Sequence, residues 1–153
     1  MVYEFTQTRR IEFAETDMAG IVHFANFYRM MESTEHAFFR SLGFSVHQEI
    51  GGVRIGWPRV FTSCEFLKPL RFEDMVDVHL LITEVRNRSI GYGFRFWKHD
   101  GAERVEVARG AVTTVCTAMG EKLSAVPIPE ALRAAISVAP AELIAIFSPT
   151  AAK

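Results

Sequence analysis

The chain has 153 residues, of which 49% are hydrophobic and 23% charged, and its formal net charge is -1. This length and balance predict one domain, residues 1–153, with a sizeable buried core. The near-zero net charge argues against a protein that binds nucleic acid or anionic membranes through a strong overall field.

Neither the N-terminus nor the cysteines indicate an exported protein. Residues 1–10 lack the apolar core of a signal peptide, and no run approaches the ~20 apolar residues of a membrane span. Cys64 and Cys116 lie in strand-like runs, which favours two reduced core thiols and leaves a disulfide between them open. Neither the cysteines nor the histidines show metal-ligand spacing, so no metal site is expected. We therefore expect a cytoplasmic protein.

The first part of the chain predicts a strand, a turn and one long helix. Loose alternation over residues 3–14 predicts the strand, and residues 15–20 carry the Asp and Gly that are typical of a turn. Apolar residues recur at helical spacing over residues 24–42, and Gly43 follows as a stop signal. The apolar stripe comprises Phe24, Phe27, Tyr28, Met31, Phe38, Phe39 and Leu42. Glu35 interrupts this stripe and needs a partner or solvent.

From residue 58 onward the apolar residues alternate with a period of two, as in half-buried strands. The predicted strands span residues 58–67, 76–86, 89–98 and 104–117. Pro129 favours a short helix that reaches Ile136. This order predicts an α+β fold in which a curved antiparallel sheet of about five strands wraps one helix. Because a lone helix leaves the other sheet face and the edges uncovered, we expect a homo-oligomer.

The segment before the helix places a carboxylate, Asp17, close to the helix entry, with Gly20 between them. Helix N-termini present unpaired N–H groups and a partial positive charge. Such groups could stabilise the oxyanion of an acyl carbonyl while Asp17 attacks the carbon or deprotonates water. The spacing fits a plain turn equally well, in which an Asp bonds the backbone two residues on.

The segment closely resembles the 4-hydroxybenzoyl-CoA thioesterase family and the related YbgC-type acyl-CoA thioesterases. The resemblance is carried by Arg10-Ile11-Glu12-Phe13, Asp17, Ala19-Gly20-Ile21-Val22 and Asn26. It continues more thinly through residues 66–78, 86–89 and 121–123. The family fold, called the hot dog, is a helix wrapped by an antiparallel sheet, which agrees with the element order predicted above.

The resemblance implies roles for the residues that match the family motif. Asp17 would be the catalytic carboxylate, as nucleophile or general base, and the backbone N–H of Phe24 would be the oxyanion donor. Gly20 matches a glycine that permits close backbone approach. Three further residues are assigned to substrate binding: Val22, His23 and Asn26. YbgC-type members tend to carry His at the Phe24 position, so this chain resembles the 4-hydroxybenzoyl branch more, and His23 is a pocket or surface residue.

Other residues are candidates for contacts with the substrate. By the same resemblance, Arg86, Arg88 and Ser89 match a basic loop that contacts coenzyme A phosphates, although a solvated hairpin explains them equally well. Lys122 is a weaker candidate of the same kind. Trp57, just before the strand that should run beside the helix, lines the acyl pocket or caps the core.

We therefore predict an acyl-CoA thioesterase. The aromatic residue at Phe24 favours a hydroxybenzoyl-like acyl group, and short or medium fatty acyl-CoA is the competing substrate class. A non-catalytic acyl-CoA-binding or regulatory module on the same fold is the alternative function. Coenzyme A is part of the substrate, so no separate cofactor is expected. The resemblance also implies a homo-oligomer, either a dimer or a homotetramer.

Overall fold

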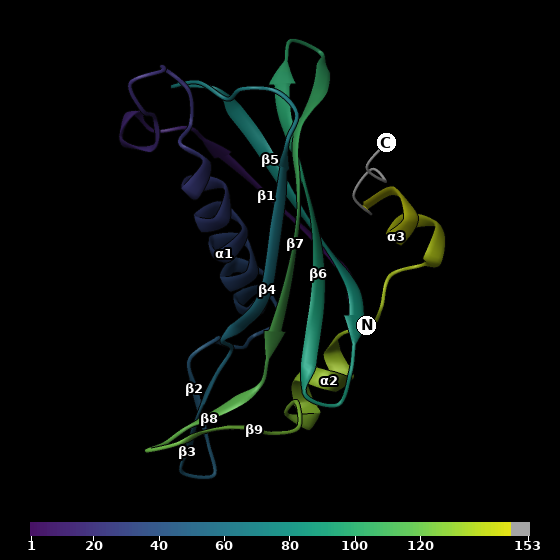
Figure 1. Ribbon diagram of the computed structural model, residues 1–153. Helices are drawn as coiled ribbons and strands as arrows, with labels where there is room; N and C mark the ends of the chain where they lie inside the picture. The colour runs from purple at the N-terminus through teal and green to yellow at the C-terminus, as the bar shows by residue number, and fades with distance from the viewer. Residues whose placement is uncertain (148–153) are drawn as a thin grey trace.

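The computed structural model describes residues 1–147, and its centre is one long helix packed against an antiparallel sheet (Figure 1). The main sheet has the strand order β1-β5-β6-β7-β4, and all neighbours in it are antiparallel. Its strands are β1 (Glu4–Arg10), β4 (Arg59–Phe66), β5 (Met75–Val85), β6 (Ser89–Asp100) and β7 (Glu103–Val115). The predicted α+β fold, with a helix wrapped by an antiparallel sheet, is confirmed.

Smaller elements join the main ones. A second sheet, of order β2-β3-β8-β9, contains β2 (Gln48–Ile50), β3 (Val53–Gly56), β8 (Thr117–Met119) and β9 (Leu123–Ala125). The short helices are the 3₁₀ helix η1 (Phe13–Glu15), α2 (Glu130–Ala135) and α3 (Ala141–Phe147). The sequence predicted α2, but neither the second sheet nor α3. The predicted first strand was too long, because the chain leaves the sheet at Arg10 and turns into η1.

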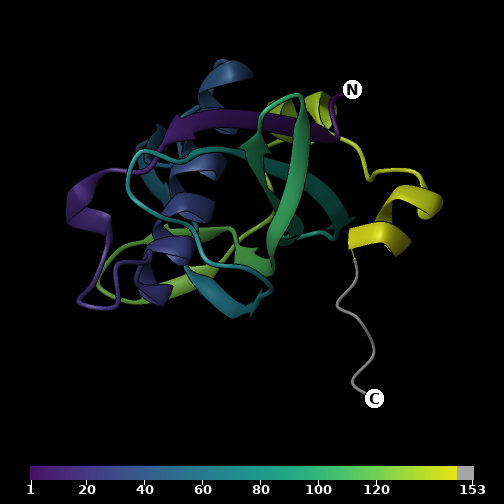
Figure 2. The ribbon, with the colours of Figure 1, turned by 90° about the horizontal axis from the view of Figure 1, so that it is seen from above.

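The helix α1 (Phe24–Ser41) lies on one face of the main sheet, and α3 lies on the other (Figure 2). The buried apolar side chains of α1 are Phe27, Met30, Met31, Phe38 and Phe39. The Phe27 ring lies 5.2 Å from the Phe66 ring and 5.3 Å from the Phe96 ring. Phe24 was predicted to share this buried stripe, and that prediction is wrong. It is 59% exposed, because the first turn of α1 borders an open cavity.

Glu35, the polar interruption of the apolar stripe, is buried with Arg59 of β4 as its partner. Its carboxylate accepts a hydrogen bond from the Arg59 guanidinium, and its side chain is 1% exposed. The second carboxylate oxygen, Oε1, has no hydrogen-bond partner within residues 1–147. Burial raises the pKa of Glu35 to about 7, although the positive charge of Arg59 opposes the shift. Ionisation of Glu35 therefore lowers the stability of the folded protein.

Replacing Glu35 with Gln should stabilise the protein above pH 7 and change its stability little below pH 4.5. The pKa of Glu35 is about 7 in the folded protein and 4.5 in the unfolded chain. Because Glu35 ionises more easily in the unfolded chain, the native protein becomes less stable as the pH rises between these two values. The gain in the free energy of unfolding should reach on the order of 3 kcal/mol. Denaturant unfolding at both ends of the window measures it.

Glu32→Gln is the matched control, because Glu32 also contacts Arg59 but is 48% exposed. It should change the free energy of unfolding by less than about 1 kcal/mol at either pH. A Glu35→Gln protein that is less stable than the native one above pH 7 would show that the ion pair with Arg59 outweighs the cost of burial.

Candidate active site

Asp17 lies in a tight loop between η1 and α1 that hydrogen bonds hold closed. The Asp17 N–H donates to the Ile21 carbonyl at 3.0 Å, and the Gly20 N–H donates to the Asp17 carbonyl at 2.9 Å. The Ala19 N–H donates to Asp17 Oδ1 at 2.8 Å, so the turn predicted as the plain alternative is present. The other carboxylate oxygen, Oδ2, receives no hydrogen bond from residues 1–147. Asp17 therefore shapes the loop and still presents a free oxygen.

Contacts with the β4–β5 connection fix this loop in place. Gly20 has a φ of 75°, and its carbonyl accepts a hydrogen bond from the Arg71 guanidinium at 3.3 Å. The Val22 N–H donates to the Leu70 carbonyl at 2.8 Å. The position of Asp17 thus depends on a segment about 50 residues further along the chain.

The start of α1 lies directly beside the loop. His23 caps the helix, because its Nδ1 accepts a hydrogen bond from the Ala25 N–H at 3.2 Å. The Asn26 side chain donates to the Glu15 carbonyl at 2.7 Å and so ties the first turn to η1. Phe24 is the first helical residue, and its N–H has no hydrogen-bond partner within residues 1–147. This N–H is available to a ligand.

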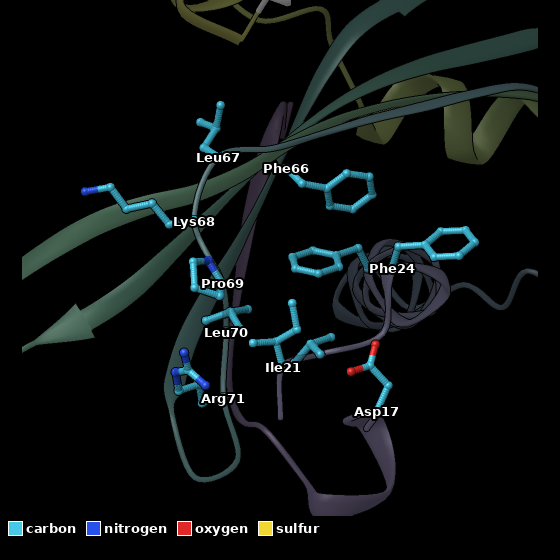
Figure 3. A pocket seen from close by; sticks show the side chains of 11 residues that line it. Asp17, Ile21, Phe24, Phe66, Leu67, Lys68, Pro69, Leu70 and Arg71 are labelled. Atoms are coloured by element: carbon cyan, nitrogen blue, oxygen red, sulfur yellow. The ribbon is translucent and has the colours of Figure 1, made fainter. Parts of the chain in front are cut away.

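Asp17 and Phe24 line one cavity of about 580 Å³, which we call the helix-side cavity. Figure 3 shows the Asp17 carboxylate directed toward the backbone at the start of α1. The walls are residues 21, 22, 24 and 27 on one side and residues 66–71 on the other. A second cavity of about 460 Å³, the loop-side cavity, is lined by Phe13, Thr16, Asp17, Met18, Gly20 and Phe72.

The structure brings four of the predicted site residues to these cavities: Asp17, Gly20, Val22 and Phe24. His23 and Asn26, which the sequence assigned to substrate binding, line neither cavity within one chain. The reason is local. The side chain at a helix cap turns back to the first N–H groups, and Asn26 is held by η1. Both residues position the helix start.

Trp57, which the sequence left as a pocket residue or a core residue, packs in the core of its own chain. It is 7% exposed, and its ring lies 5.4 Å from that of Phe39. It lies two residues before the first residue of β4, Arg59, which pairs with Thr114. That end of the sheet is remote from the Asp17 loop, so Trp57 does not line the cavity in its own chain.

The predicted basic residues also lie far from Asp17 within one chain. Residues 86–89 form the turn after β5, whereas Arg10 and the loop that follows it lie at the other end of β5, opposite Met75. The 11 residues of β5 separate the two ends by on the order of 30 Å. Lys122 lies in the β8–β9 turn at the same remote end (Figure 1).

Sequence reasoning missed the second wall of the helix-side cavity. This wall comprises Phe66, Leu67, Lys68, Pro69, Leu70 and Arg71. The residues have no periodic pattern of their own, and only the fold brings them to the Asp17 loop. The one local signal is the Lys68-Pro69-Leu70-Arg71 run, which is a proline-bearing connection between two strands.

Every helix within residues 1–147 is too short or too polar to span a membrane. In the same part of the chain, no three His, Cys, Asp or Glu side chains are grouped so that they could hold a metal ion.

The fold and the site together define a hot-dog protein with a carboxylate at the entry of its central helix. Residues 19–105, more than half of the chain, match the Thioesterase superfamily. The chain belongs to this family, which confirms the family predicted from the sequence.

Relatives and solved structures agree with this placement. A relative from Aquifex aeolicus (strain VF5) is 31% identical over 80% of this chain and 91% of its own length. The 4-hydroxybenzoyl-CoA thioesterase of Pseudomonas sp. (strain CBS-3) is 26% identical over 84% of this chain and 94% of its own length. The crystal structure of a 1,4-dihydroxy-2-naphthoyl-CoA thioesterase from Synechocystis has a TM-score of 0.76 and 26% identity, and covers 86% of this chain and 94% of that one.

Substituting Gly20 with Ala should lower the free energy of unfolding by roughly 1 kcal/mol. A Cβ at this position would meet only the Arg71 guanidinium, at an ordinary 3.8 Å, so the cost comes from the φ of 75°. Gly120→Ala is the control, because its Cβ would have an equally ordinary contact of 3.8 Å without a left-handed φ. Denaturant unfolding compares the two, and equal effects would remove the conformational argument for Gly20.

Proposed function

We propose that this protein hydrolyses the thioester bond of an acyl-coenzyme A, with Asp17 as the catalytic carboxylate. The observation that carries the proposal is one cavity lined by both Asp17 and Phe24, whose N–H is unpaired. A thioester bound there would have its carbonyl oxygen at the helix start and its carbon beside the carboxylate. Membership of the Thioesterase superfamily supports the same chemistry.

Two routes are open to Asp17, and they differ in what the carboxylate attacks. As a nucleophile, it attacks the thioester carbon while the Phe24 N–H stabilises the oxyanion. The C–S bond then breaks, the thiolate leaves and takes up a proton, and water hydrolyses the mixed anhydride. As a general base, Asp17 takes a proton from water as that water attacks the same carbon. Neither route needs a separate cofactor.

Turnover in isotopically labelled water tests for the nucleophilic route. Label enters the Asp17 side chain when water opens the anhydride at the Asp17 carbon, and its presence there would establish the covalent intermediate; attack at the acyl carbon labels only the released acid. In the general-base route the label enters only the released acid. Mass spectrometry of the peptide that contains Asp17 reads the difference.

The substrate we propose carries an aromatic acyl group. Three rings line the helix-side cavity, those of Phe24, Phe27 and Phe66, and aromatic pairs favour edge-to-face contact with a further ring. Two related proteins are named for aromatic acyl-CoA substrates, 4-hydroxybenzoyl-CoA and 1,4-dihydroxy-2-naphthoyl-CoA. Short or medium fatty acyl-CoA is the competing class. Ranking a panel of both classes by kcat/KM decides between them.

Asp17→Asn should lower kcat by roughly 10²–10⁴-fold, because it keeps the size and polarity of the side chain but removes the reacting charge. Release of the coenzyme A thiol, followed with a thiol-reactive dye, measures the rate. Asp100→Asn is the control, since Asp100 is exposed in the β6–β7 hairpin, and it should keep the native rate.

The alternative, an acyl-CoA-binding module without turnover, is favoured by the turn that Asp17 Oδ1 makes with the Ala19 N–H. In that case Asp17 would only shape the loop. Tight binding of acyl-CoA without any release of thiol by the native protein would support the module. An Asp17→Asn protein as fast as the native one would exclude the proposed mechanism.

We also propose a homo-oligomer whose copies pair along β4. This strand is an edge of the main sheet, and Val60, Phe61 and Phe66 on it are 64%, 54% and 49% exposed. An exposed apolar edge strand favours pairing with a second chain. Antiparallel pairing of two β4 strands would reverse the second copy. The turn at residues 86–89 of the second copy would then lie at the end of the sheet where the first copy carries Asp17. The predicted phosphate contacts could form there.

Phe61→Lys should convert the oligomer into a monomer and remove most of the hydrolytic activity, because a charge on the edge strand opposes pairing. Light scattering gives the mass, whether of a dimer or a homotetramer, and thiol release gives the activity. Leu123→Lys is the control, since Leu123 is 63% exposed on β9, which belongs to the second sheet and not to the main sheet. A monomeric Phe61→Lys protein with full activity would contradict the need for a second copy.

We further propose a cytoplasmic location, which the two free cysteines support. Burial raises the pKa of Cys64 to about 12 and that of Cys116 to about 11, so both remain protonated and unreactive. Such thiols suit a reducing compartment. Cell fractionation tests this location.

A further inference from the structure

A group of buried polar atoms between α1 and the main sheet has no hydrogen-bond partner within residues 1–147. It comprises Glu35 Oε1, the Tyr92 hydroxyl and Thr114 Oγ1, and these are the only buried side-chain oxygens in the described chain that lack a partner. The three residues are 1%, 1% and 0% exposed, so bulk solvent does not reach them. Buried polar groups are nearly always hydrogen-bonded, because an unpaired one has lost its hydration without replacement.

The fold brings the three side chains together from three elements. Thr114, on β7, lies directly across from Ile90 on β6. Tyr92 follows Ile90 by two residues, so its side chain is on the same face of the sheet as that of Thr114. Burial raises the pKa of Tyr92, the Glu35 carboxylate adds to the rise and the Thr114 hydroxyl opposes it, which makes the three groups neighbours. The two hydroxyls nevertheless have no hydrogen bond with each other.

The other polar side chains around Glu35 are engaged with partners of their own. The Arg59 guanidinium donates to Oε2, the other carboxylate oxygen of Glu35, and lies 3.5 Å from the Glu32 carboxylate. Thr34, buried next to Glu35 on α1, donates its hydroxyl to the Gln7 side chain at 3.0 Å. The unpaired oxygens are thus confined to one part of the core, and a single small partner can serve all three.

The chemistry of the three oxygens specifies that partner. An ionised carboxylate oxygen only accepts hydrogen bonds, whereas each hydroxyl can donate one and accept another. A water molecule that donates to Glu35 Oε1 and to one hydroxyl, and accepts from the other hydroxyl, satisfies all three atoms. It then makes three hydrogen bonds, which is the usual number for a water buried inside a protein.

We propose that Glu35, Tyr92 and Thr114 form a binding site for one water molecule in the core. The water joins α1 to β6 and β7, while Arg59 joins the same carboxylate to β4. The site is separate from the proposed active site, because none of its three residues lines either cavity at Asp17. Arg59 also lines a surface cavity of about 150 Å³, so the water exchanges with solvent past that side chain.

A crystal structure at a resolution that shows ordered water tests the site in the native protein. One water should lie within about 3 Å of all three oxygens. A direct hydrogen bond between the Glu35 carboxylate and the Tyr92 hydroxyl, with no water beside them, would overturn the proposal.

Magnetic relaxation dispersion of the water oxygen nucleus counts the long-lived buried waters in solution. The double variant Tyr92→Phe/Thr114→Val removes both hydroxyls and keeps the side-chain shapes, so its count should be one lower than that of the native protein. Thr34→Val is the matched control, because this hydroxyl has a partner in the protein, and it should leave the count unchanged. A double variant with the native count contradicts the site. Should that variant fail to fold, the native crystal structure alone decides.

Discussion

The entry of α1 is the constraint on which the rest of the site depends. A helix begins with N–H groups that have no partner within the helix, and the chain must supply partners or leave them unpaired. Here His23 caps the Ala25 N–H, and Asn26 ties the first turn to η1. The Phe24 N–H remains unpaired beside a cavity and near a carboxylate. The partial positive charge at this helix start would stabilise an oxyanion formed beside it.

The core holds this helix start in position. Phe27, one turn after the cap, lies between Phe66 and Phe96 and lines the helix-side cavity as well. The same ring therefore belongs to the hydrophobic core and to the site. Further along the helix, the Glu35–Arg59 pair joins α1 to β4 despite the cost of burying the carboxylate. The helix start cannot shift without disturbing contacts along the whole length of α1.

Local patterns predicted most of the fold and the residues before α1 that line one side of the helix-side cavity. The period-two and helical repeats indicated the five main strands and α1, because burial on one face leaves a regular signal. The same reasoning failed for Phe24, whose spacing fits the apolar stripe although a cavity lies beside it. Residues 66–71 were missed as a wall because only tertiary contacts bring them to Gly20 and Val22. Strands of three or four residues, as in the second sheet, are too short to show a period.

The strand β4 connects the substrate cavity to the assembly of the protein. Its last residue, Phe66, forms part of the helix-side wall, while its outer edge has no neighbour in the main sheet among residues 1–147. In one chain Phe66 is 49% exposed and Phe24 is 59% exposed, and both side chains line the helix-side cavity. An acyl group bound there would bury apolar surface of both side chains. If a second copy pairs along β4, it lies next to the strand that ends at Phe66, and the shape of the cavity that receives the acyl group then depends on the oligomer.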